Sequence, residues 1–180
     1  MIAKELKFAL KREQACSIKE SVRKVGGILI YPRTREMNTA YDDSAGSVQV
    51  QDARLSLQSG PNYSLSYERA LSRGSVRQDL VLATKVGSMA EMKKILRRIG
   101  FRPVTNYVRH RTTWEIGSAK VSLCEFLFGT YLEIVGETQQ LLRLAERFGF
   151  AMKDSITASY DDLYRAHRLK KVETVMHSSG

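Results

Sequence analysis

The feature of the sequence that most restricts its fold is an alternation of apolar and polar residues in many short segments. In residues 4–10 (KELKFAL), Leu6 and Phe8 alternate with Glu5 and Lys7. A β-strand turns successive side chains to opposite faces, so this segment has one apolar and one charged face. Ser/Gly/Pro turns separate the later segments, as in an antiparallel meander. These segments are residues 27–32, 36–43, 52–58, 63–69, 75–83, 105–114, 120–127 and 130–136.

A few helical segments interrupt the strands. The clearest spans residues 88–101, where Ser88 and Glu91 form a capping box and Gly100 follows the last turn. Further helices are expected at residues 14–26, at residues 138–148 and from residue 159 onward. We therefore predict an α+β protein with a single domain over residues 1–170 and a flexible C-terminal tail over residues 171–180.

The charge balance points to an anionic partner. The chain holds 29 Lys and Arg against 19 Asp and Glu, a formal net charge of +10. Such a field favours an anionic partner, which could be nucleic acid, a phosphate compound or an acidic membrane surface, and a basic surface that serves only solubility is the alternative. No apolar run reaches the length of a membrane span, so no membrane partner is expected. Cys16 and Cys124 lie far apart without metal-ligand spacing, which favours reduced thiols and a cytoplasmic location.

The polar faces of the strands carry both signs of charge near the strand centres. Arg77 and Asp79 share one face, Arg109 and Arg111 share another, and Glu133 is central in the last strand. An open sheet with one solvated face explains any single strand. The recurrence of charge favours a closed sheet, which would gather these groups in one basic lumen. Such a lumen would bind a polyanion, and its carboxylates could hold a divalent cation.

The order of the segments resembles the CYTH family, also called triphosphate tunnel metalloenzymes, which includes class IV adenylate cyclases, thiamine triphosphatases and inorganic triphosphatases. Residues 3–7 match the family's N-terminal ExExK strand, residues 38–42 its "NTYFD" strand and residues 159–163 its closing "SY..L". The similarity covers nearly the whole chain. Other matching segments are residues 65–68, 76–79, 95–101, 108–114, 121–124 and 129–134.

The resemblance implies a closed eight-stranded antiparallel β-barrel, or tunnel, with helices packed on its outside. In this family, basic tunnel residues bind a triphosphate and acidic residues hold magnesium or manganese. By position, Glu5 and Glu133 are the expected metal ligands. The expected phosphate-binding residues are Lys7, Arg77, Arg109 and Arg111. Asp79 falls on an acidic position of the family, and the candidate accessory residues are Lys120, Arg35 and Arg54.

Several positions depart from the family pattern. Ala3 replaces the first Glu of ExExK, and residues 55–58 (LSLQ) lack both arginines of an "LRLR" strand. Glu68 replaces a lysine, Val81 an acidic residue and Cys124 an aspartate. Phosphoryl transfer depends on metals and cations placed against developing charge, and removing one such group costs on the order of 10²–10³ in rate. Several losses together predict weak catalysis.

Three hypotheses follow. The first is a divergent CYTH-like protein that binds a nucleotide, polyphosphate or other phosphate-rich anion, with weak or lost catalysis. The second is an active Mg²⁺- or Mn²⁺-dependent triphosphatase or adenylate cyclase with rearranged ligands. The third is a scaffold reused for nucleic-acid or protein interaction, in which the basic run of residues 165–171 could take part. The sequence assigns no catalytic residue and leaves the oligomeric state open, including a dimer.

Overall fold

The computed structural model describes the backbone of residues 1–178 and the side chains of residues 1–171. Its strands are β1 (Ile2–Leu10), β2 (Ile28–Asp42), β3 (Ala53–Ser59), β4 (Ser64–Arg73), β5 (Arg77–Lys85), β6 (Arg102–Ile116), β7 (Ala119–Phe126) and β8 (Gly129–Val135). Its helices are α1 (Arg12–Lys24), α2 (Ser47–Val50), α3 (Met89–Arg98), α4 (Thr138–Arg147), the 3₁₀ turn η1 (Met152–Asp154) and α5 (Tyr160–Ser178).

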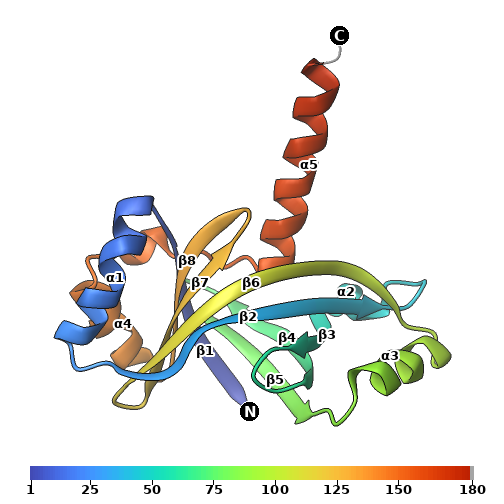
Figure 1. Ribbon diagram of the computed structural model, residues 1–180, viewed down its shortest axis with the longest axis horizontal. Helices are drawn as coiled ribbons and strands as arrows, with labels where there is room; N and C mark the ends of the chain where they lie inside the picture. Colours follow the sequence, from blue (N-terminus) through green and yellow to red (C-terminus); the bar gives the residue numbers. More distant parts are fainter. Residues whose placement is uncertain (179–180) are drawn as a thin grey trace.

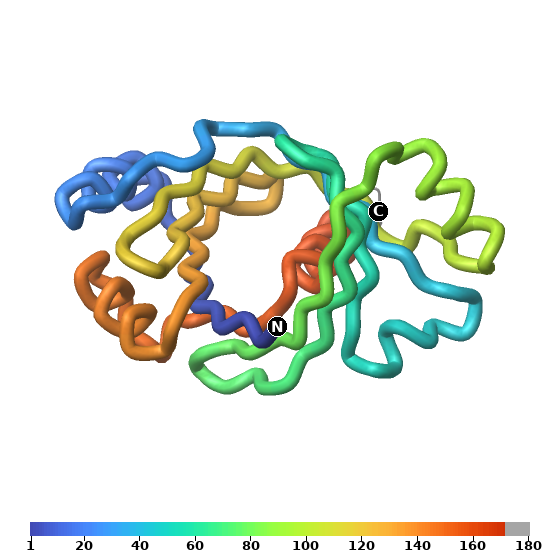
Figure 2. The backbone as a smooth tube through the Cα atoms, turned by 90° about the horizontal axis from the view of Figure 1, so that it is seen from below, coloured from blue at the N-terminus to red at the C-terminus, as the bar shows by residue number. Residues whose placement is uncertain are grey.

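The strands close into one barrel in the order β1-β5-β4-β3-β2-β6-β7-β8. Every neighbouring pair is antiparallel. Figure 2 looks along the opening that the strands enclose. The predicted α+β class and the closed eight-stranded barrel are therefore confirmed.

The alternation in β1 shows why the barrel is polar inside and apolar outside. Leu6 and Phe8 are almost completely buried, and both belong to the main apolar cluster between the barrel wall and the helices. Lys7 points the other way and lies opposite Glu133 of β8. Since side chains alternate along a strand, this register turns Glu5 and Lys7 into the lumen, whereas Lys4 shares the outward parity of Leu6 and pairs with Glu137.

Helices cover two parts of the outer wall (Figure 1). Ile18 and Val22 of α1 join Leu141 and Leu144 of α4 in the cluster that covers β1, β7 and β8. On another side, Leu96 of α3 packs in a second cluster with residues of β2 and β3. Each helix thus buries an apolar stripe against the outward faces of the strands, as an amphipathic helix in a globular protein does.

Two local features differ from the expectation. The predicted strands 27–32 and 36–43 form one long strand, β2, whose pairing with β6 shifts register between Leu29 and Tyr31 and between Tyr31 and Thr34. Pro32 lies within this irregular stretch and has no N–H for a regular ladder. The connection between β2 and β3, expected as a turn, contains the short helix α2, because the carboxylate of Asp42 accepts hydrogen bonds from the backbone N–H groups of Val48 and Gln49.

The last helix, α5, projects from the barrel (Figure 1). It starts at Tyr160, next to the predicted start at residue 159, where the side chains of Ser159 and Asp162 are hydrogen-bonded to each other. It continues to Ser178, across most of the segment expected as a tail. Flexibility of that segment stays a prediction, and residues 179 and 180 lie outside the described residues. Within the described chain, no helix combines the length and apolar character needed to cross a lipid bilayer.

Candidate anion-binding tunnel

The barrel brings the predicted charged residues together. Lys7 from β1, Arg77 from β5, and Arg109 and Arg111 from β6 all line a central cavity of about 210 Å³. The two predicted metal ligands, Glu5 and Glu133, line the same cavity. These side chains share the inward parity of their strands, so the pattern in the sequence was sufficient to place them.

Of the accessory candidates, some lie in the central cavity and others lie outside it. Arg54 and Asp79 line the central cavity, whereas Lys120 is exposed at one mouth of the tunnel beside Arg111. Arg35 is not brought to the cavity: it is exposed on the outer wall, opposite His110 of β6. It adjoins the inward-facing Glu36 in the same strand, and neighbouring residues of a strand point to opposite faces.

Every basic side chain of the central cavity has a carboxylate partner. Arg77 Nε lies 2.7 Å from Asp79 Oδ2, and Lys7 Nζ lies 2.9 Å from Glu5 Oε1. The lumen is therefore close to charge-balanced, which corrects the expectation of a basic tunnel. The remaining pairs are Arg109–Glu36 at 2.6 Å, Arg111–Glu133 at 3.2 Å, Arg54–Asp161 at 3.3 Å and Arg54–Glu68.

Two of these carboxylates were missed by sequence reasoning. Glu36 lies between Arg109 and Arg111, with its Oε2 3.6 Å from Arg111 Nε. Its inward parity was readable, since Asn38 follows two residues later on the same face. Asp161 enters the tunnel from the first turn of α5, where it contacts Arg54 and Thr105. No strand pattern could have signalled it, because it belongs to a helix.

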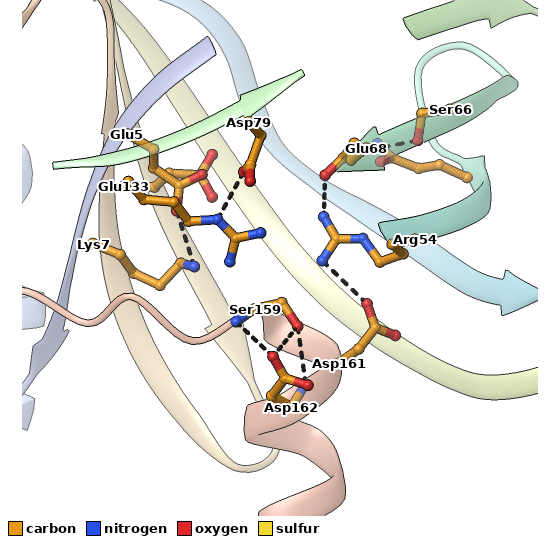
Figure 3. A network of polar contacts seen from close by, with 12 residues as sticks. Glu5, Lys7, Arg54, Ser66, Glu68, Asp79, Glu133, Ser159, Asp161 and Asp162 are labelled. Atoms are coloured by element: carbon orange, nitrogen blue, oxygen red, sulfur yellow. Dashed lines mark hydrogen bonds and ion pairs between the residues drawn. The ribbon is translucent and has the colours of Figure 1, made fainter. Parts of the chain in front are cut away.

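The segment that leads into α5 occupies one side of the lumen (Figure 3). Lys7 Nζ donates to the carbonyl of Ala158, and Arg77 Nη1 donates to the carbonyl of Thr157, each at 3.0 Å. The Lys7 ammonium also lies 4.3 Å from the ring centre of Tyr160, within cation–π range. The segment before α5 thus accepts hydrogen bonds from two of the residues that were predicted to bind phosphate.

Three neighbouring cavities make up the tunnel. One end cavity, of about 280 Å³, shares Gln58, Arg111 and Glu133 with the central cavity. The other end cavity, of about 260 Å³, shares Arg54 and Arg77 with it and lies beside the start of α5. The shared side chains show that the three cavities follow one another through the barrel.

The electrostatics of the lumen stabilise the charged form of Glu133. Burial alone would raise the pKa of this carboxyl, but Arg111, Arg109 and Lys7 outweigh it and lower the pKa to about 2. Burial raises the pKa of the Cys124 thiol, although Arg111 opposes the shift. The thiol is therefore neutral near pH 7 and a poor ligand for a hard cation.

Five buried polar atoms on the cavity wall have no hydrogen-bond partner among the described residues, and one of them, the Tyr160 hydroxyl, can donate or accept. Two are donors, Asn38 Nδ2 and Arg111 Nε, and two are acceptors, Glu5 Oε1 and Asp79 Oδ1. A buried polar group without a partner typically costs about 1–3 kcal/mol. These atoms indicate a cavity built for a polar occupant.

The donor set does not fit a preformed magnesium or manganese site. Mg²⁺ needs oxygen ligands in near-octahedral geometry. Glu5 and Glu133 are instead paired with Lys7 and Arg111. Among the described residues, no three His, Cys, Asp or Glu side chains are grouped closely enough to hold a metal ion. The alanine at position 3 and the thiol of Cys124 stand where the family would supply further carboxylates.

Fold and site together define a closed antiparallel tunnel with charged groups inside and helices outside. Solved structures share this architecture. A proposed adenylate cyclase from Vibrio parahaemolyticus matches with a TM-score of 0.80 at 17% identity, over 92% of this chain and 98% of that chain. A proposed adenylyl cyclase from Hippeastrum, described as having a dominant triphosphatase activity, matches with a TM-score of 0.68 at 16% identity, over 93% and 96% of the chains.

A further match departs from these enzymes. A chain of the Schizosaccharomyces pombe Mediator head module matches with a TM-score of 0.53 at 13% identity, over 99% of this chain and 96% of that chain. No family model and no curated protein matches the sequence. The comparisons confirm the tunnel fold implied by the CYTH resemblance, the fold of adenylate cyclase-like and triphosphatase proteins.

Proposed function

We propose that this chain binds a phosphate-containing anion, such as a nucleotide or polyphosphate, in its tunnel, with weak or lost catalysis. The observation that carries this proposal is the convergence of Arg77, Arg109, Arg111 and Lys7, from three strands, on one cavity. Arg111 Nε, which has no hydrogen-bond partner among the described residues and lies 3.6 Å from Glu36 Oε2, belongs to the wall of the same cavity. Guanidinium groups bind phosphate oxygens through charge-assisted hydrogen bonds, which are among the stronger hydrogen bonds in proteins. The triphosphatase activity described for the Hippeastrum protein supports the choice of anion.

Weak catalysis follows from the internal pairing. Each cavity cation already faces a carboxylate, so less positive charge is left to stabilise a phosphoryl transition state. Position 68 adds a carboxylate, which pairs with Arg54. The lack of a preformed metal site removes a second source of stabilisation. An active Mg²⁺- or Mn²⁺-dependent triphosphatase or cyclase would need ligands that rearrange on binding.

The binding proposal is tested by calorimetric titration of tripolyphosphate and ATP, with EDTA and separately with Mg²⁺ or Mn²⁺. We expect binding to the unmodified protein, weakened at least about tenfold by Arg111→Gln, which removes one charge-assisted contact. Arg35→Gln is the matched control, because Arg35 lies outside the lumen and its loss should leave affinity unchanged. Circular dichroism confirms that both variants are folded. An equal effect of the two variants, or no binding of either anion, would contradict the proposal.

Activity assays on the same protein samples test whether the chain is catalytic. Phosphate release or cyclic AMP formation that depends on Mn²⁺ and is abolished by Glu5→Ala would favour the active enzyme. Binding without turnover supports the anion-binding protein. Glu5 lines the cavity, so its removal changes the lumen and leaves the outer wall intact.

A scaffold function is the second candidate, and the projecting helix α5 favours it. Arg168 and Lys171 are exposed on this helix, beyond the first turn that contacts the barrel. The Mediator head module match supports a use of the fold within an assembly. Salt-dependent RNA binding that survives Arg111→Gln but is lost in the Arg168→Glu/Lys171→Glu double variant would support this candidate. RNA binding lost in Arg111→Gln would oppose it.

A further inference from the structure

Four of the five cavity atoms without a hydrogen-bond partner in the described chain lie on opposite walls of the barrel, and the fifth, the Tyr160 hydroxyl, belongs to α5. In the strand order, β1 and β5 are neighbours, and β2 and β6 are neighbours. Two strands, β4 and β3, separate the pairs on one side, and two strands, β7 and β8, separate them on the other. The β1/β5 wall therefore faces the β2/β6 wall across the lumen.

The β2/β6 wall presents donors. Asn38 is more than nine-tenths buried, and its Nδ2 has no hydrogen-bond partner among the described residues. Arg111 Nε, on the neighbouring strand, is also without one. Glu36, a carboxylate on this wall, accepts from Arg109 Nε at 2.6 Å, and the same Oε2 lies 3.6 Å from Arg111 Nε, beyond hydrogen-bond distance. An oxyanion on this side would receive hydrogen bonds from both orphan donors.

The β1/β5 wall presents acceptors. Asp79 is more than nine-tenths buried; its Oδ2 accepts from Arg77 Nε at 2.7 Å, while Oδ1 has no partner in the described part of the chain. Glu5 Oε1 is likewise unpartnered by a hydrogen bond, although Lys7 Nζ lies 2.9 Å away. Carboxylate oxygens only accept, so these two atoms call for a donor from the occupant.

A plain polyanion matches only one of the two walls. It would satisfy Asn38 and Arg111, but its charge would be repelled by Glu5 and Asp79 across a cavity of about 210 Å³. An occupant with an oxyanion on one side and N–H donors on the other would satisfy all four atoms. Leaving buried polar groups unpaired is costly, so this difference should control specificity.

We propose that the tunnel is specific for a small zwitterion, whose phosphate group lies against the β2/β6 wall and whose protonated amine lies against the β1/β5 wall. The inference rests on the proposed anion-binding function and defines its ligand class. Glu5 and Asp79, two residues that the family pattern would associate with a metal, are then the specificity residues for the amine.

An ammonium group suits the acceptor wall better than a divalent metal ion. It carries three N–H donors and one charge, and two carboxylate oxygens plus a further acceptor satisfy it. A metal ion would need more oxygen ligands than Glu5 Oε1 and Asp79 Oδ1 supply. The adjacent Arg77 and Lys7 also repel a double charge more strongly than a single one.

The test compares two probes that differ in the amine, phosphoethanolamine and ethyl phosphate, by calorimetric titration in EDTA. We expect phosphoethanolamine to bind about tenfold tighter, the ratio that one added charge-assisted hydrogen bond provides. Asp79→Asn should bring this ratio close to one, because the amide loses the charge yet can still accept from Arg77. Glu125→Gln is the control: Glu125 pairs with Arg33 on the outer wall, and its loss should keep the tenfold ratio.

Three results would overturn the inference. Equal affinity for the two probes is the first, and an amine preference unchanged in Asp79→Asn is the second. The third is tight binding of tripolyphosphate only with Mg²⁺ and no gain from the amine, which would leave the anion-binding function standing. If tripolyphosphate, ATP, ethyl phosphate and phosphoethanolamine all fail to bind, with or without metal, the proposed function fails as well.

Discussion

The ion pair between Glu36 and Arg109 provides the sharpest test of how the lumen is held together. Both side chains are more than nine-tenths buried, and Arg109 Nε lies 2.6 Å from Glu36 Oε2. Removing one partner of a buried pair leaves an uncompensated charge, which costs roughly 3–5 kcal/mol. Arg109→Met should fall at the lower end, because Arg111 Nε is still 3.6 Å from Glu36 Oε2. Glu36→Met should fall at the upper end, because Arg109 then loses its carboxylate partner and keeps the weak bond to Gln58 at 3.4 Å and the cation–π contact with Tyr160 at 5.7 Å.

The double variant Glu36→Met/Arg109→Met tests whether the two buried charges compensate each other. Replacing both members by apolar side chains removes the stranded charge, so its loss of unfolding free energy should be smaller than either single loss. Urea unfolding of the four proteins measures this coupling. For a chain of this size, about 3 kcal/mol corresponds to a fall in melting temperature of roughly 6–12 °C. Additive losses in the double variant would refute the reasoning, since they would mean that the two charges do not compensate each other.

Three further predictions concern stability. Because the pKa of Glu133 is lowered from 4.5 to about 2, its ion pairs add stability above pH 4.5 that is lost as the pH falls towards 2. Acid unfolding of Glu133→Gln should therefore depend less steeply on pH in that window; an unchanged slope would contradict the assignment. Leu6→Ala removes a fully buried side chain beneath the helices and should cost about 2–5 kcal/mol in urea unfolding, whereas exposed Leu127→Ala should cost little. Asp42→Ala removes the acceptors for the N–H groups of Val48 and Gln49 in α2 and should cost about 0.5–2 kcal/mol, whereas Asp42→Asn keeps one acceptor oxygen and should restore part of the loss. No loss in Asp42→Ala would show that α2 needs no cap.

The alternation of inward and outward residues along each strand was the main basis for predicting which side chains face the lumen. Lys7, Arg77, Arg109 and Arg111 alternate with apolar neighbours, and a two-residue period leaves only one way to bury those neighbours under helices. The same rule, applied to Arg35, excludes it from the lumen once Glu36 is known to point inward. Local patterning thus determined which face each residue occupies.

The charge state of the lumen depends on partners that local patterning does not specify. The pairing of Arg109 with Glu36 depends on β2 lying beside β6, and the pairing of Arg54 with Asp161 depends on where α5 begins. The helix α2 depends on the Asp42 side chain reaching over the turn at Gly46. Such contacts are set by the closed topology, so an excess of positive residues in the sequence did not imply an excess in the cavity.

The root of α5 lies inside the barrel, while the rest of the helix stands clear of it. Tyr160 and Asp161 are more than nine-tenths buried, whereas residues from 166 to 171 are exposed. A helix of 19 residues is about 28 Å long. Rotating its first turn by about 10° would move its far end by about 5 Å. A small change of orientation at the tunnel wall would therefore become a larger displacement at the end of α5. A partner that holds the far end would feel any rearrangement around Lys7 and Tyr160, even though it never touches the cavity.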